Sequence, residues 1–211
     1  MANIKKQKNS KILLVGLGNP DASYQNTRHN AGYNFLNYLA NKYGSEEWKN
    51  NKKCLAKINI LKINACPIIL AKPLVFMNQS GKILNLLKKF YHLSFQHIFI
   101  AHDDADIILG DFKIHYGRGS AGHKGIQSII QSLKSKNFYR IRIGIRSFSR
   151  RQKAGKLVLA NFSSQEKQIL NQIFPIIEEQ LIKICAPKNK QKNEKAKPRE
   201  CLKPKHSMRD N

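Results

Sequence analysis

A chain of 211 residues, of which 41% are hydrophobic, is long enough to bury the core of one ordinary domain, and this composition excludes a wholly disordered protein. Lys and Arg number 38 against 13 Asp and Glu, which gives a formal net charge of +25. A charge of this size predicts a polyanionic partner, most simply nucleic acid. The abundance of Lys, Asn and Ile is also typical of an AT-rich genome, so charge alone does not identify the partner.

Short apolar or alternating runs predict strands, and apolar residues at helical spacing predict helices. In chain order, we expect a strand at 11–17, a helix at 28–43, strands at 55–63 and 67–71, a helix at 79–91, strands at 97–101 and 112–116, a helix at 123–133, a strand at 139–145 and a helix at 165–185. A Gly-rich loop precedes the third helix, a polar, basic connection occupies 148–157, and Pro175 should bend or divide the last helix. This order predicts an α/β fold: a single-domain sandwich with a mixed, mainly parallel twisted sheet flanked by helices.

Composition divides the chain into three parts: a basic extension at 1–10, a domain at 11–186, and a basic tail at 187–211 that we expect to be disordered. The four cysteines show neither a C-x-x-C pair nor zinc spacing, so we expect reduced, structural thiols. No apolar run is long enough for a membrane span or a secretory signal. We therefore expect a cytoplasmic protein without a membrane partner.

Three polar residues follow or precede predicted elements in a way that suggests chemistry. Asn19 and Asp103 come just after two apolar strands, so parallel pairing would bring both to one edge of the sheet. His29 stands at the start of the helix that follows the first strand. An aspartate that accepts from one imidazole nitrogen leaves the other as a base. A histidine at a helix start is by itself more often structural, and its pairing with Asp103 favours the catalytic interpretation.

Several other kinds of site are missing from the sequence. Gly16-Leu17-Gly18 lacks the third glycine of a dinucleotide fingerprint, and there is no phosphate-loop lysine, so we expect no nucleotide cofactor. No G-x-S-x-G elbow supplies a nucleophile, and no residue cluster has metal-ligand spacing. A base without nucleophile or metal indicates direct activation of water, which suffices for an ester because an alkoxide leaves readily.

Four segments in order carry a resemblance to the bacterial peptidyl-tRNA hydrolase family, over about residues 11–185. They are Gly16-Leu17-Gly18-Asn19-Pro20 with Thr27-Arg28-His29-Asn30-Ala31-Gly32, Lys72-Pro73 with Phe76-Met77-Asn78-Gln79-Ser80-Gly81, His102-Asp103-Asp104-Ala105-Asp106, and Gly119-Ser120-Ala121-Gly122-His123-Lys124-Gly125. The resemblance implies hydrolysis of the ester that joins a peptide to the ribose of tRNA. It implies that His29 activates water, that Asp103 holds His29 in its basic form, and that Asn19 binds the peptide. It implies a monomer that needs no metal or cofactor.

The same resemblance implies that Tyr24, Phe76 and Asn78 bind the tRNA-linked substrate. This sequence departs from the family at Asp21, where glycine is common, and at Lys124, where many members have a binding asparagine. Lysine cannot accept a hydrogen bond, but it can bind a phosphate as a point charge. We carry the binding role over to Lys124 on that basis.

Other interpretations remain open at this point. Without the resemblance, Phe76 and Met77 would be assigned to the core, Tyr24 would be a loop anchor, and His123 would be only a helix cap. The protein could also be a non-catalytic RNA-binding protein on the same fold, although such a protein would not need a base and its orienting carboxylate. A nucleotide-dependent enzyme is a third alternative, which the missing fingerprint disfavours.

Overall fold

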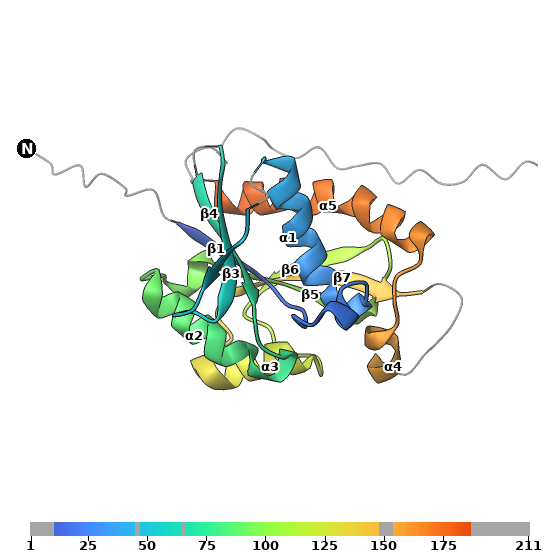
Figure 1. Cartoon of the computed structure of the whole chain (residues 1–211), viewed down its shortest axis with the longest axis horizontal. Coiled ribbons are helices and arrows are strands. Elements are labelled where there is room, and N and C mark those ends of the chain that lie inside the picture. Colours follow the sequence, from blue (N-terminus) through green and yellow to red (C-terminus); the bar gives the residue numbers. More distant parts are fainter. Residues whose placement is uncertain (1–10, 45–46, 65, 148–153, 187–211) are drawn as a thin grey trace, which may run out of the picture.

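The computed structural model describes residues 11–44, 47–64, 66–147 and 154–186. The predicted N-terminal extension and basic tail lie outside these described residues. Most of the chain between them forms one sheet with helices on both of its faces (Figure 1).

The sheet has seven strands in the order β2-β3-β4-β1-β5-β7-β6. The four central strands, β4, β1, β5 and β7, run parallel, whereas β2, β3 and β6 pair in antiparallel fashion at the two sides. The strands are β1 (Ile12–Gly16), β2 (Lys49–Asn51), β3 (Ala56–Ile63), β4 (Cys66–Pro73), β5 (Ile98–Ile108), β6 (Phe112–Tyr116) and β7 (Tyr139–Arg146).

The helices lie in two layers that bury the two faces of the sheet (Figure 1). The helices are α1 (Ala31–Lys42), α2 (Ser80–Phe90), α3 (Lys124–Leu133), α4 (Ala154–Leu159) and α5 (Ser164–Cys185), with short 3-10 helices η1 (Ala22–Tyr24), η2 (Arg28–Asn30), η3 (Met77–Gln79) and η4 (Phe95–His97). Helices α1 and α5 pack into one core cluster with residues such as Phe35 and Ile177, and α2 and α3 into another with Leu84 and Ile129. Among the described helices, none is both long and apolar enough to cross a membrane.

The predicted α/β sandwich with a mixed sheet is confirmed, and three local predictions are wrong. The strand β2 has a polar sequence and was not predicted, because its pairing with β3 and not its own pattern defines it. Part of the predicted connection at 148–157 is helix α4; residues 148–153 lie outside the described chain. Helix α5 runs unbroken through Pro175, so the expected division is wrong and the expected bend stays a prediction. Phe174 and Ile177 on either side of Pro175 are buried in the core and offset the lost hydrogen bond.

The strand β5 extends well past the end predicted for it, and this extension creates the site. Pairing of β1 with β5 ends at Ala101, but β5 continues beside β7, with Asp103 opposite Ile143. Asp103 therefore lies inside a strand, beyond the carboxyl end of β1. This is the switch point of the sheet, where the connections after β1 and β4 turn to opposite faces and where ligands bind in such folds.

Gly32 allows the start of α1 to pack against this switch point. A Cβ atom at Gly32 would lie 2.3 Å from the Ala101 carbonyl oxygen and 2.6 Å from the Leu17 backbone nitrogen. No side chain fits at these distances, so only glycine lets the helix start approach both strands. The close approach brings the preceding helix η2, which carries His29, next to β5.

Candidate active site

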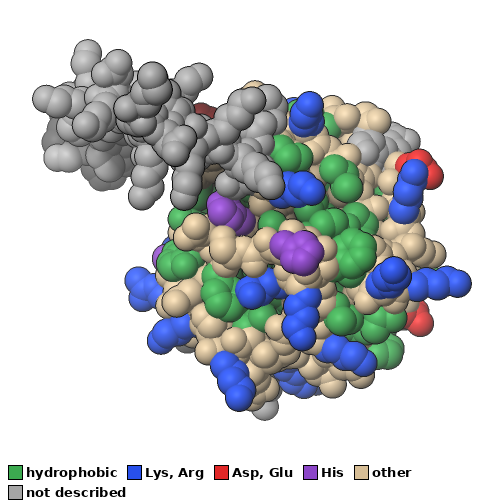
Figure 2. Space-filling model, turned by 90° about the vertical axis from the view of Figure 1, so that its left-hand side faces the viewer, with side chains coloured by type: hydrophobic (Ala, Val, Ile, Leu, Met, Phe, Trp, Pro, Cys, Tyr) green, Lys and Arg blue, Asp and Glu red, His purple; other side chains and the backbone are tan. Residues whose placement is uncertain are grey.

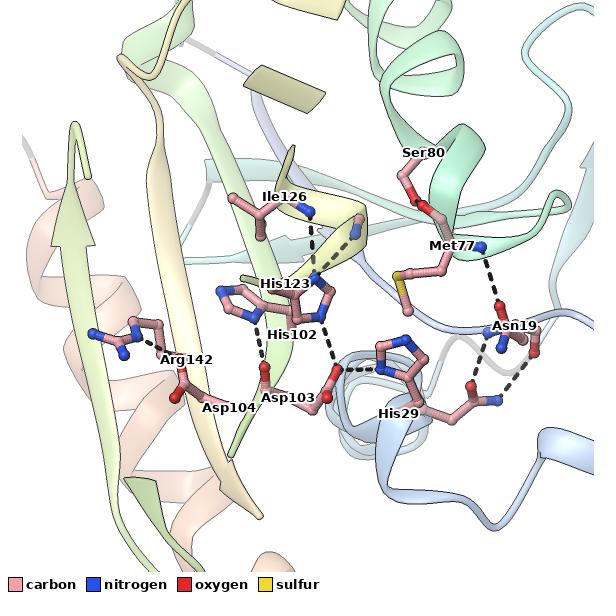
Figure 3. A network of polar contacts seen from close by, with 12 residues as sticks. Asn19, His29, Met77, Ser80, His102, Asp103, Asp104, His123, Ile126 and Arg142 are labelled. Carbon is pink, nitrogen blue, oxygen red and sulfur yellow. Dashed lines mark hydrogen bonds and ion pairs between the residues drawn. The ribbon is translucent and has the colours of Figure 1, made fainter. Parts of the chain in front are cut away.

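Asn19 lies just beyond β1 and is held by residues from two other segments (Figure 3). Its backbone N–H donates to Asn30 Oδ1 at 2.8 Å, and Asn30 Nδ2 donates to the Asn19 carbonyl at 3.1 Å. The Asn19 side-chain oxygen accepts from the Met77 backbone N–H at 3.1 Å. This bond orients the amide group, and the side-chain nitrogen, which can only donate, has no partner among the described residues and is available to a ligand.

His29 projects from η2 toward β5 (Figure 3). Its Nδ1 atom lies 2.9 Å from Asp103 Oδ1, and its side chain is 12% exposed. A carboxylate can only accept, so Nδ1 carries the proton and donates it. In the neutral ring, Nε2 then keeps its lone pair. The structure thus brings together the two residues that the sequence pattern was expected to pair.

His123 shares the same carboxylate oxygen from the other side. Its Nε2 atom is 2.9 Å from Asp103 Oδ1, while its Nδ1 atom accepts from the backbone N–H groups of Gly125 at 3.1 Å and Ile126 at 3.3 Å. Because Nδ1 accepts, the ring proton is on Nε2 and is donated to Asp103. The interpretation of His123 as only a helix cap is therefore incomplete, since it caps α3 and also holds Asp103.

Asp103 is only 1% exposed. Burial by itself would raise the pKa of this carboxyl, but the charge and hydrogen bonds of His123 and His29 outweigh it and hold the pKa well below its usual range. Asp103 is thus ionised at neutral pH and fixes the orientation of both rings.

The same three residues also resemble a metal site, because His29, Asp103 and His123 place their ligand atoms within 4.8 Å of one another. If His123 Nε2 bound a cation, the ring proton would move to Nδ1. There it would face the N–H groups of Gly125 and Ile126, which already donate to that atom. The start of α3 therefore favours a hydrogen-bonded His–Asp–His group over a metal centre.

His102 supports this group from the neighbouring position on β5. Its Nδ1 atom donates to the Asp103 carbonyl at 2.7 Å, and its ring meets that of His123 edge to face with centroids 4.5 Å apart. Burial, with a smaller contribution from His123, holds the pKa of His102 well below its ordinary value. The ring is therefore neutral and packs against His123 without adding charge.

A cavity of about 520 Å³ opens beside His29, with polar and apolar side chains on its walls. Phe76 and Leu159 are 55% and 54% exposed, so the alternative assignment of Phe76 to the core is wrong. Among the described residues that line the cavity, there is no serine, threonine or cysteine. The walls of the cavity include Asn19, His29, Phe76, Asn78, Lys124 and Leu159.

The predicted binding residues divide into two groups. Phe76, Asn78 and Lys124 line the cavity, whereas Tyr24 lies on η1 and is absent from the described lining residues. Asp21 begins η1 with a φ of −67° and accepts from the Ser23 N–H at 2.8 Å. This departure from the family pattern therefore introduces no left-handed backbone.

Sequence reasoning missed the contribution of α4 to the cavity. This helix supplies Gly155, Val158 and Leu159 to the walls. The only sequence signal for this helix was the apolar run Leu157-Val158-Leu159, which follows a basic stretch. A run of three residues is too short to show helical spacing.

Basic residues share one face of β6 and β7 beside the cavity. Lys113 is opposite Arg142 and His115 is opposite Arg140, so these four side chains share one face of the sheet. Arg142 Nε donates at 2.6 Å to Asp104, which lines the cavity. Of these side chains, Lys113 is exposed, whereas Arg140 is buried and burial lowers the pKa of His115.

The fold and the cavity define an α/β protein with a histidine–carboxylate site and amide donors at the switch point of its sheet. The model of the peptidyl-tRNA hydrolase family matches residues 13–204. The peptidyl-tRNA hydrolase of Mycolicibacterium vanbaalenii is 39% identical over 157 residues, which cover 74% of this chain and 81% of that protein. The one from Dichelobacter nodosus is 46% identical over 133 residues, or 63% of this chain and 70% of that protein.

Solved structures agree with these relatives. The crystal structure of peptidyl-tRNA hydrolase from Acinetobacter baumannii superposes with a TM-score of 0.73 at 31% identity, and it covers 84% of this chain and 93% of that one. The chain belongs to the peptidyl-tRNA hydrolase family. The prediction of a hydrolase of this type, made from four short motifs, is confirmed.

Proposed function

We propose that this enzyme hydrolyses the ester between a peptide and the 3′-terminal ribose of tRNA, with His29 Nε2 as the base that activates water. The observation that carries the proposal is the 2.9 Å contact between His29 Nδ1 and Asp103 Oδ1. It assigns the proton of the ring to Nδ1 and leaves the Nε2 lone pair for a water molecule at the cavity.

The reaction needs one proton to be taken up and then returned. Nε2 removes a proton from water as the hydroxyl oxygen attacks the ester carbonyl carbon. The resulting imidazolium is stabilised by the ionised Asp103, in the manner of a catalytic triad. When the carbon–oxygen bond to the ribose breaks, Nε2 returns the proton to the ribose oxygen. The products are the peptide carboxylic acid and tRNA with a free 3′ hydroxyl, available for reuse in translation.

Donors on the cavity wall suit the two carbonyl groups that such a substrate presents. The bond from Met77 orients the Asn19 amide, whose side-chain nitrogen can donate to a peptide carbonyl. Asn78 can donate to the oxyanion that forms at the ester. The exposed Phe76 ring supplies apolar contact for the peptide.

The RNA part of the substrate fits the positive charge around the cavity. Lys124 lines the cavity and can pair with a phosphate near the 3′ end, and Arg142 lies beyond Asp104 on the adjoining sheet face. Tyr24 keeps its proposed role as a contact to tRNA outside the cavity. That the enzyme acts as a monomer in the cytoplasm, without a metal, stays a prediction.

The decisive experiment compares wild type with His29→Ala on peptidyl-tRNA and on aminoacyl-tRNA with a free amino group. We expect wild type to release peptide but leave aminoacyl-tRNA intact, and His29→Ala to lose hydrolysis while tRNA affinity is kept. His97→Ala is the matched control, because His97 bonds Ser94 on η4 away from the cavity. Turnover retained in His29→Ala would refute the role of the base, and wild type that only binds tRNA would favour the non-catalytic alternative.

A further inference from the structure

A second hollow, of about 550 Å³, lies at the opposite end of α2 from the cavity. It is formed by the hairpin of β2 and β3 together with the last turn of α2. Its lining residues are Lys49, Asn50, Asn51, Lys52, Lys53, Ile58, Phe90 and Tyr91, and we call it the hairpin groove. It shares no described residue with the cavity around His29.

The charge of the hairpin groove has one sign among its described lining residues. Lys52 and Lys53 are exposed, and within the described chain neither forms an ion pair. Lys49 is partly offset by Glu47 at 3.5 Å. The turn that carries the lysines has a defined shape, because Asn51 Oδ1 accepts from the Cys54 N–H at 3.0 Å. These cations are therefore presented from an ordered hairpin.

An aromatic pair completes the groove. Phe90 is 46% exposed, and its ring meets the Tyr91 ring edge to face, with centroids 4.9 Å apart and planes at 82°. The Tyr91 contact restrains the Phe90 ring, and nearly half of Phe90 stays exposed to solvent. Lysines for phosphates beside an aromatic face for bases are the two components of a surface that binds single-stranded or frayed nucleic acid.

The groove lies within reach of an RNA whose 3′ end occupies the cavity. Helix α2 begins directly after Asn78 and Gln79 of η3, at the cavity, and ends at Phe90 in the groove. At 1.5 Å per residue, this helix spans about 16 Å. Figure 2 shows Lys and Arg side chains spread over one face of the molecule, and on the part of that face that is not grey the acidic side chains lie near the margin.

We propose that the hairpin groove is a second RNA-binding site, which contacts the RNA of the peptidyl-tRNA beyond its 3′ end. Lys52 and Lys53 bind phosphates there, and Phe90 stacks on a base. The proposal rests on the proposed function for the identity of the RNA. The groove contributes to affinity for the whole tRNA and takes no part in breaking the ester.

The test compares two variants, Lys52→Gln/Lys53→Gln and Phe90→Ala, on two substrates. One substrate is full-length peptidyl-tRNA, and the other is a peptidyl ester of a short oligonucleotide with only the 3′-terminal nucleotides. We expect Phe90→Ala to lower kcat/KM on full-length substrate about tenfold. The lysine variant should reduce the slope of log affinity against log salt by about 1.4 to 1.8. Neither variant should change hydrolysis of the short ester.

Lys11→Gln/Lys62→Gln is the matched control, because it removes the same charge from exposed positions that line neither hollow. An equal effect of the two lysine pairs would show that only total charge matters and would overturn the proposal. Loss of short-ester hydrolysis in the groove variants would overturn it as well. Direct binding of deacylated tRNA separates the two proposals, since groove variants must weaken that binding even if wild type hydrolyses nothing.

Discussion

Replacing Glu166 by Gln tests whether the ion pair between Glu166 and Arg28 holds the neighbouring residue His29, the proposed base, in place. Arg28, the residue before His29 on η2, has its Nη2 atom 2.9 Å from both Glu166 carboxylate oxygens. The Arg28 backbone N–H donates to the Ala160 carbonyl at 2.9 Å, and its guanidinium lies over the Phe162 ring, 5.1 Å from the centroid. The segment that leads into α5 thus fixes Arg28, and Arg28 in turn should fix the orientation of His29.

The expected loss of stability depends on how deeply the Arg28–Glu166 ion pair is buried. The side chains of Arg28 and Glu166 are 9% and 17% exposed. Removing one charge of a fully buried pair costs about 3–5 kcal/mol, but Gln keeps an acceptor and some water reaches the pair, so we expect about 2 kcal/mol. For a protein of this size that lowers Tm by about 4–8 °C. Since a misplacement near 1 Å costs about 10²-fold, a smaller tilt of η2 should lower kcat about tenfold with little change in KM.

Ser163→Ala provides the matched control. Ser163 and Glu166 form the capping box of α5, but only Glu166 contacts Arg28. Loss of the cap costs about 1 kcal/mol and should lower Tm by about 2–4 °C with kcat unchanged. Thermal unfolding and single-turnover hydrolysis measure the two effects. Unchanged kcat in Glu166→Gln, or the same loss of kcat in both variants, would refute a positioning role for the Arg28–Glu166 pair.

Three further changes test the electrostatics of the described chain. Asp103→Asn should lower the single-turnover rate roughly 10²–10⁴-fold while tRNA affinity is kept, because an amide cannot stabilise charge that forms on His29; a rate near wild type contradicts this. Burial alone would raise the pKa of Glu178, but hydrogen bonds from a lysine and two tyrosines outweigh burial and lower this pKa. The ionised Glu178 therefore stabilises the fold above about pH 4.3, and this stabilisation is lost as the pH falls. The stability deficit of Glu178→Gln in urea unfolding should therefore be large at pH 7 and shrink at pH 3, and a constant deficit contradicts the argument. Burial lowers the pKa of Lys72 to about 7, and its ammonium lies 3.7 Å from the Trp48 ring centroid, so fluorescence of this single tryptophan should change near pH 7 and Lys72→Met should abolish the transition.

Local sequence patterns predicted the central strands and main helices because each buries its own apolar face. The limits of β5 could not be predicted in this way. Its apolar run ends at Ala101, and the polar Asp103 and Asp104 look like a loop. They are strand residues because β7 pairs with them. That partner comes forty positions later in the chain, so no local window around Asp103 contains the information.

The site, like the fold, could be predicted from the sequence only in part. His29 and Asp103 could be paired from the sequence because strand ends and helix starts meet at the switch point of any such sheet. The second role of His123 could not, because a helix cap has the same sequence whether or not its free nitrogen meets a carboxylate. That contact depends on α3 docking against β5, which brings its first turn to Asp103.

The sharing of Asp103 by two imidazoles has a chemical consequence for the proposed reaction. A proton on His29 Nε2 must be held well enough to be taken from water, yet released to the ribose oxygen within the same turnover. An aspartate paired with His29 alone would hold the imidazolium more strongly. His123 donates to the same oxygen and cannot turn away, because the first turn of α3 occupies its other nitrogen. Part of the negative charge of Asp103 is therefore always engaged by His123, which moderates the attraction that His29 feels without allowing Asp103 to become protonated.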